Sequence, residues 1–188
     1  MIKDKLIDLV KDATGNRYRD RTVGIWLELA FGTVIGQLFK NDPAQYDLYT
    51  KSYVVPVVQQ KPRPYSVLPV RIIETSDMAN GVRNIFSTED DDLDFVPMPL
   101  NGFSFYNAVK LDDVTDSVGY SVKGGIVEYW NMSSAVTSVR MELVRAFSEW
   151  DGSEDIPLPS GTENIIVSQA IQMITSQKPE TNIYKTKQ

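Results

Sequence analysis

Residues 155–164 read Asp-Ile-Pro-Leu-Pro-Ser-Gly-Thr-Glu-Asn and lead directly into an apolar helical pattern. The two prolines disfavour helical geometry in the residues that precede them, so the helix must begin after the second proline. Ser160 and Glu163 have the spacing of a capping box, in which each side chain binds a free backbone N–H group. The sequence therefore predicts a capped C-terminal helix over residues 160–176.

A polar segment, residues 177–188, follows this helix. It cannot bury enough apolar area to offset the entropy lost on folding by itself. We therefore expect an extended C-terminal arm that attaches to another protein. Ile183 and Tyr184 are its apolar anchors, and the candidate partner-binding residues are Lys178, Ile183, Tyr184, Lys185 and Lys187.

The composition excludes several functional classes. The chain has 188 residues, enough for one sizeable core, and 42% of them are hydrophobic. It has no cysteine and no histidine, which excludes disulfides, cysteine nucleophiles, and the commonest general base and metal ligand. The formal net charge of -6 argues against affinity for DNA, because such binding requires cations that neutralise phosphates. We expect no sequence-specific nucleic-acid partner.

Two helices are predicted within residues 1–40. The first is short and amphipathic, and the second, over residues 22–39, is apolar on nearly all sides with Glu28 as its only ionisable side chain. A membrane span needs about 20 apolar residues, so a buried helix of a soluble assembly is the favoured interpretation. Gly32 and Gly36 lie one turn apart and allow another backbone to approach closely, which makes them candidates for subunit packing.

The clearest local signal is a β-hairpin. The Gly-Gly pair at residues 124–125 suits a two-residue turn in which both positions have positive φ. This turn places Val122 opposite Val127 and Tyr120 opposite Tyr129, with all four side chains on one face.

A β region surrounds this hairpin. Pro56 confines its strand to an edge or a bulge, because proline has no N–H to donate. Residues 137–147 fit both a strand and a helix, and their β-branched residues favour a strand. The expected fold class is α+β, in which N-terminal helices and a C-terminal helix pack with a mainly antiparallel β sandwich or barrel. The expected organisation is a single domain over residues 1–176, with helices in 1–40, the β region over 46–147 and a helix over 160–176, followed by the arm over 177–188.

Residues 88–94 carry the densest charge in the chain. Asp90, Asp92 and Asp94 have the spacing of the first three ligands of a calcium loop, but the turn glycine and the closing glutamate of that loop are absent. Like charges so close together are tolerated where water screens them. We therefore expect a solvent-exposed loop that binds no metal.

A search for catalytic motifs finds no phosphate-binding glycine loop, no dinucleotide-binding glycine motif and no zinc-protease motif. The carboxylates are spread over loops, and nothing marks a pair for acid–base chemistry. We expect that the protein is not an enzyme, with no catalytic residues, no cofactor and no metal site.

Two segments carry a resemblance to a known family. They are residues 120–131, where the hairpin runs into Tyr129-Trp130-Asn131, and residues 156–188, which begin Ile156-Pro157-Leu158-Pro159. Together with the order of helices, β region and C-terminal helix, they resemble neck proteins of tailed bacteriophages. These are the head–tail adaptor or ring proteins under the portal, as in podoviruses and crAss-like phages.

The resemblance implies a structural virion protein that is made in the host cytoplasm and forms a homo-oligomeric ring, commonly of twelve copies, in the neck or tail. It implies that the helix from Ser160 and the arm from Lys178 bind the portal protein or neighbouring neck and tail proteins. DNA passes through such a ring, and an acidic lumen avoids trapping phosphates. Residues 88–94 would then face either that lumen or the ring exterior.

Other interpretations remain open at the level of the sequence. One is another ring of the phage tail. A second is a soluble, non-enzymatic binding module with an aromatic-rich β surface. A third is a membrane-peripheral subunit that uses the helix over residues 22–39.

Overall fold

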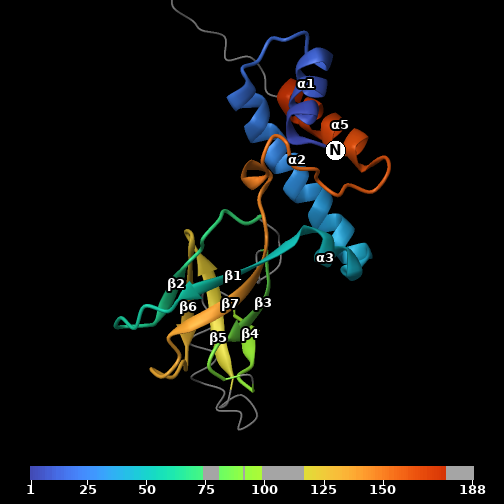
Figure 1. Ribbon diagram of the computed structural model, residues 1–188. Coiled ribbons are helices and arrows are strands. Elements are labelled where there is room, and N and C mark those ends of the chain that lie inside the picture. The colour runs from blue at the N-terminus through green and yellow to red at the C-terminus, as the bar shows by residue number, and fades with distance from the viewer. Residues whose placement is uncertain (74–80, 91, 99–116, 177–188) are drawn as a thin grey trace, which may run out of the picture.

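The computed structural model describes residues 1–73, 81–90, 92–98 and 117–176, and it confirms the α+β fold class. The chain folds into a helical lobe and a β lobe, which lie one above the other in Figure 1. The chain enters the β lobe after α3 and returns to the helical lobe after β7, so the helical lobe is built from the beginning of the described chain and from its last part. The elements are α1 (Lys3–Ala13), α2 (Asp20–Asn41), η1 (Pro43–Gln45), α3 (Tyr46–Tyr49), β1 (Thr50–Pro56), β2 (Tyr65–Val67), β3 (Val82–Ser87), β4 (Phe95–Pro97), β5 (Val118–Lys123), β6 (Ile126–Trp130), β7 (Ser138–Val144), η3 (Phe147–Glu149) and α5 (Thr162–Ser176).

Helix α2 is the centre of the helical lobe and packs against α1, α5 and η3. Leu27, Phe31 and Ile35 recur at intervals of four residues and are fully buried on its inner face. The expected apolar stripe of α5 also faces this core, where Ile166 and Ala170 are fully buried. Helix α2 is therefore a core helix on one side, as its apolar sequence predicts.

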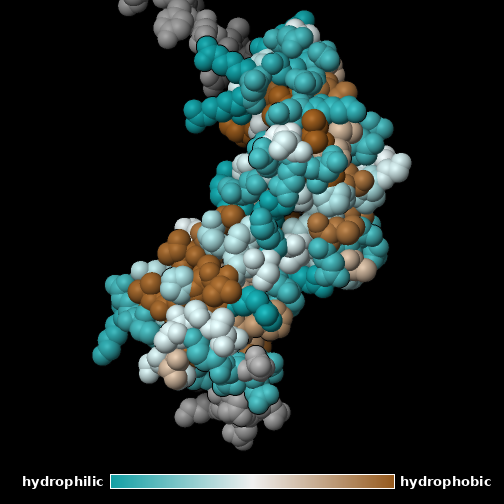
Figure 2. All heavy atoms as spheres, in the orientation of Figure 1, coloured by the Kyte–Doolittle hydropathy of each residue, from teal (hydrophilic) through white to brown (hydrophobic). Residues whose placement is uncertain are grey.

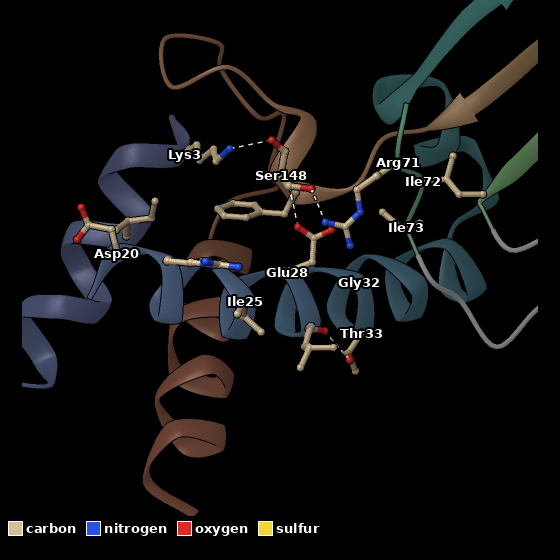
Figure 3. Close-up of a pocket in the computed structure, with 15 residues that line it drawn as sticks. Lys3, Asp20, Ile25, Glu28, Gly32, Thr33, Arg71, Ile72, Ile73 and Ser148 are labelled. Carbon is tan, nitrogen blue, oxygen red and sulfur yellow. Dashed lines mark hydrogen bonds between the residues drawn. The ribbon is translucent and has the colours of Figure 1, made fainter. Parts of the chain in front are cut away.

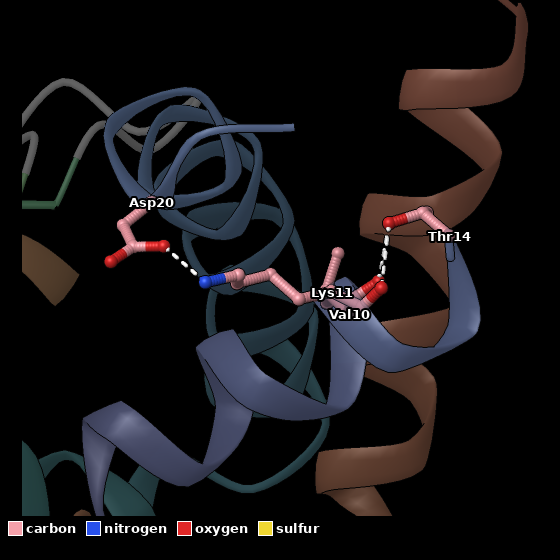
Figure 4. Close-up of polar contacts among 4 residues, drawn as sticks. All are labelled: Val10, Lys11, Thr14 and Asp20. Carbon is pink, nitrogen blue, oxygen red and sulfur yellow. Dashed lines mark hydrogen bonds and ion pairs between the residues drawn. The ribbon is translucent and has the colours of Figure 1, made fainter. Parts of the chain in front are cut away.

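The connection between α1 and α2 is closed by local polar contacts (Figure 4). Thr14 ends α1 by donating its hydroxyl to the carbonyl oxygen of Val10 at 2.8 Å, and Gly15 then takes a φ of +66°. Across the connection, Lys11 Nζ donates to Asp20 Oδ1 at 2.7 Å. The hydrogen bond and charge of Asp20 raise the pKa of Lys11. These contacts fix the angle at which α2 leaves α1.

The predicted capping box at the C-terminal helix is wrong. Helix α5 begins at Thr162, and Gly161, immediately before it, has a φ of +86°. That left-handed conformation, which glycine adopts readily, places the start of the helix two residues beyond Ser160. Thr162 N instead donates to the carbonyl oxygen of Pro159 at 3.0 Å, so a backbone turn leads into the helix.

The β lobe consists of a three-stranded sheet in the order β1-β7-β3 and a four-stranded sheet in the order β2-β6-β5-β4. All pairs are antiparallel except β4 with β5. The predicted hairpin register is confirmed, because Val122 pairs with Val127 and Tyr120 with Tyr129. The edge position predicted from Pro56 is confirmed as well, since β1 is an outer strand of its sheet.

The two sheets enclose a second hydrophobic cluster, separate from the cluster of the helical lobe. Its largest buried rings belong to Tyr120, which is 3% exposed, and Tyr129, which is fully buried. Burial raises the pKa of Tyr120 to about 12 and raises that of Tyr129 further. Each lobe thus has its own core, and the single domain over residues 1–176 stays a prediction.

Backbone hydrogen bonds and ion pairs join the lobes, and one of the ion pairs is formed by Arg83 of β3 and Asp47 of α3. Val144 N, at the end of β7, donates to the carbonyl oxygen of Gly81 at 2.9 Å. Arg145 then binds Glu154 through two hydrogen bonds of 3.0 and 2.7 Å, and its guanidinium lies 4.0 Å from the centre of the Trp150 ring. The hydrogen bonds of Arg145 lower the pKa of Glu154. The junction is therefore held by side chains as well as by the chain itself.

Candidate interaction surface

A groove of about 540 Å³ runs along the outer face of α2. Its floor is α2 itself, and its walls are the start of α1, residues 71–73 and residues 147–148 (Figure 3). These walls come from segments far apart in the sequence, so no local pattern predicts the groove. We call it the α2 groove.

Apolar side chains of α2 lie exposed in the α2 groove. Ile25 is 55% exposed and Leu29 is 48% exposed, and their spacing of four residues places them on one face of the helix. A Cβ atom at Gly24, beside them, would meet no atom within 4 Å. The groove is therefore open, and the side of α2 opposite the core has no cover within the described part of the chain.

The wall at residues 147–148 is anchored by three polar contacts to Ser148 (Figure 3). Its backbone N–H donates to Glu28 Oε2 at 2.8 Å, and its carbonyl oxygen accepts from Lys3 Nζ at 2.9 Å. Arg71 Nη1 donates to its hydroxyl at 3.5 Å. Glu28, the only ionisable side chain of residues 22–39, therefore holds the wall at Ser148 in place through this hydrogen bond.

The rim of the α2 groove carries cations, Lys3, Arg21 and Arg71, that form no ion pair within the described part of the chain. Lys3 and Arg71 donate to uncharged oxygens, and Lys3 also lies over the Phe147 ring at 5.8 Å. Arg21 is exposed, and within the described ranges it forms no ion pair. Asp20 is bound to Lys11. An apolar partner that carries acidic groups would therefore match both the floor and the rim.

Gly32 and Gly36, the predicted subunit-packing residues, lie on α2. Gly32 is buried and lines the α2 groove, whereas Gly36 is half-buried and lies one turn farther along the helix. The arm residues Lys178, Ile183, Tyr184, Lys185 and Lys187 lie outside the described residues.

The titratable groups that the structure describes do not form a catalytic arrangement. Burial raises the pKa of Tyr49 to about 12 and also raises that of Tyr53. Glu89 is exposed on the β lobe, and local hydrogen bonds lower the pKa of its carboxyl group. Among the described residues, no group of three or more acidic side chains is placed to hold a metal ion.

Residues 88–94 form the acidic loop, and every described residue in it that carries a carboxylate is exposed. Glu89 lies at its start, where the Thr137 hydroxyl donates to Oε1 at 2.5 Å. This hydrogen bond, with smaller contributions from Thr88 and Ser138, lowers the pKa of Glu89 from 4.5 to about 2. The loop is thus tied to the strand that begins at Ser138, and Asp90, Asp92 and Asp94 are exposed to solvent.

A pH dependence follows from Glu89. Its pKa is lower in the folded protein, so its ionised form stabilises the fold above pH 4.5, and this contribution is lost as the pH falls from 4.5 towards 2. We expect Thr137→Val to reduce the loss of stability across this range, measured as the urea midpoint at each pH. Thr137→Ser keeps the hydroxyl and should behave as the wild type. A slope unchanged by Thr137→Val would contradict the assignment.

The β lobe offers a second surface. Figure 2 shows apolar side chains gathered on the β lobe close to its junction with the helical lobe. A smaller groove, of about 430 Å³, lies between residues 68–72 and the turn of the β5–β6 hairpin. Leu68, Val70 and Val122 contribute to it and are half-buried, so they project less than the apolar residues of the α2 groove.

Comparison with protein-family models finds no match, and comparison with curated proteins finds no significant match. In the described ranges, α2 is the one helix long and apolar enough to cross a membrane, a property that core helices of soluble proteins share.

Proposed function

We propose that the chain is a structural virion protein that forms a head–tail connector ring in the neck of a tailed bacteriophage. The ring attaches to the portal protein and lets DNA pass. The observation that carries this proposal is the α2 groove, an apolar surface that no described part of the chain covers. Contiguous exposed apolar surfaces of this kind mark interaction sites, protein–protein contacts among them.

The sequence supports the proposal through the two segments that resemble neck proteins, residues 120–131 and 156–188. In this proposal the C-terminal arm, with Ile183 and Tyr184 as anchors, attaches each subunit to the portal or to the adjacent ring. Ordering the arm costs on the order of 1 kcal/mol per residue, so only contacts with a partner can offset it.

Two alternatives are affected differently by the structure. A binding module with an aromatic-rich β surface loses support at three of its aromatic residues, because Tyr120, Tyr129 and Trp130 are at most 4% exposed, and the two tyrosines pack in the core of the β lobe. Another ring of the phage tail keeps the same support as the neck ring, since both require an assembling subunit without catalytic groups.

The test is the mass and symmetry of the purified protein, alone and on a portal, by native mass spectrometry and electron microscopy. Closed rings, formed alone or on the portal, are the expected result. The position of the density in the virion then separates a neck ring from a tail ring. A stable monomer that modifies a small substrate would overturn the proposal.

Substitutions in the α2 groove test whether this surface takes part in assembly. We expect Ile25→Asp combined with Leu29→Asp to weaken assembly more than tenfold, because each introduces a charge where an apolar contact forms. Both side chains are about half exposed in the monomer, so the fold should persist. Ile165→Asp is the matched control, since Ile165 is 58% exposed on α5, away from the groove. Sedimentation velocity measures assembly, and equal behaviour of both variants would exclude the groove.

A further inference from the structure

The molecule has a basic end and an acidic end. Arg17, Arg19 and Arg21 lie in and beside the connection between α1 and α2, at the far end of the helical lobe in Figure 1. All three are exposed, and within the described part of the chain none of them forms an ion pair. We call these three residues the basic end. The α2 groove begins beside it, since Asp20 and Arg21 line the groove.

The acidic end consists of Glu89, Asp90, Asp92 and Asp94, between β3 and β4 at the opposite extreme of the molecule (Figure 1). Asp90 Oδ1 accepts the backbone N–H of Asp92 at 3.1 Å, which holds the turn, and Asp92 and Asp94 are exposed. Among the described residues no cation pairs with these carboxylates.

The acidic end also carries an apolar side chain. Val96 follows in β4 and is 42% exposed. The acidic end therefore carries carboxylates, which complement the cations on the rim of the α2 groove, and an apolar side chain, which complements the apolar floor. Because the two surfaces lie at opposite ends of one chain, they cannot meet within it.

We propose that the acidic end of one copy docks at the basic end and α2 groove of the next copy. The proposal rests on the ring function and specifies its subunit contact. The contact is head-to-tail, and a head-to-tail contact closes into a ring when the rotation between neighbours allows it. Asp92 and Asp94 approach Arg19 and Arg21, and Val96 packs towards Ile25.

The charges of the two ends favour a second copy of the chain, and not a neutral peptide, as the partner that binds the α2 groove. Residues 89–94 carry five carboxylates in six positions, like charges this close in sequence repel one another, and cations of a neighbour relieve that repulsion. The rim pairs stay accessible to solvent, so salt screens them, and we expect assembly of the wild type to weaken as ionic strength rises.

The test is a charge exchange in the full-length chain, measured by sedimentation velocity over a range of protein concentrations. The basic-end variant is Arg19→Glu with Arg21→Glu, and the acidic-end variant is Asp92→Lys with Asp94→Lys. We expect each to weaken assembly about tenfold or more, because like charges then face each other across the contact. The four substitutions combined restore opposite charges and should return assembly to within about threefold of the wild type.

Lys61→Glu with Lys123→Glu is the matched control for the basic-end variant, because it reverses two exposed cations of the β lobe and lowers the net charge by the same amount as that variant. It should assemble like the wild type. Rings that form normally in both charge-reversed variants would overturn the proposed contact and leave the ring function standing. Weakened assembly in both variants without recovery in the combined variant would also overturn it. A wild type that forms no oligomer, even on a portal, would instead overturn the ring function itself.

Discussion

Replacement of Phe31 by alanine is expected to lower the free energy of unfolding by about 4 kcal/mol, since removal of a fully buried phenylalanine ring typically costs 3–5 kcal/mol. Phe31 is fully buried, and its ring centre lies 6.4 Å from that of Tyr49 and 5.6 Å from that of Phe147. The ring therefore joins α2 to the chain segments that enter and leave the β lobe. Urea denaturation followed by circular dichroism measures the change.

The control for this prediction is Ile165→Ala. Its side chain is 58% exposed, so the free energy of unfolding should change by no more than about 0.5 kcal/mol. A loss below about 1 kcal/mol for Phe31→Ala would show that the three rings do not form the centre of the helical lobe.

Gly81→Ala is expected to destabilise the junction of the lobes by about 3 kcal/mol. Gly81 has a φ of +79°, and a Cβ atom there would lie 2.7 Å from the carbonyl oxygen of Ile73 and 3.1 Å from Cβ of Ile72. The left-handed conformation alone costs an L-residue about 1–2 kcal/mol. Displacing a packed backbone adds about 1–3 kcal/mol.

Gly125→Ala separates these two contributions. Gly125 has a φ of +85°, close to that of Gly81, but a Cβ atom there would meet nothing within 4 Å. It should therefore lose only about 1–2 kcal/mol, from the backbone conformation. Thermal and urea unfolding of both variants measure the difference, and equal losses would show that the close approach at the junction is absent.

The sequence predicts those parts of the fold that depend on neighbours along the chain. The hairpin register follows from two glycines and the alternation beside them, because a two-residue turn leaves one pairing. The sequence predicts the helix over residues 22–39, but not which of its sides is buried, because that helix is apolar on nearly all sides. The cap of α5 fails because Gly161 offers a left-handed conformation that competes with the capping box.

The candidate site depends on distant segments and could not be predicted. The α2 groove exists because residues 71–73 and 147–148 reach α2 after the chain has passed through the β lobe. That approach depends on the pairing of β1 with β7, which joins Thr50 to Val144, and local propensity does not fix such a pairing. The sequence therefore marks Glu28 as the only ionisable side chain of residues 22–39, but it does not predict that Glu28 accepts a hydrogen bond from Ser148.

The closure of the helical lobe has a consequence for how the protein is made. Ile156 N donates to the carbonyl oxygen of Met1 at 2.9 Å, and Ile2 pairs with Asp155, so the lobe that opens the chain is completed by its last quarter. At about 5–20 residues per second, a ribosome needs on the order of ten seconds to pass from the end of α2 to α5. During that interval α1 is present but α5 and η3 are not, so part of the inner face of α2 stays uncovered and the nascent chain is a natural client for chaperones.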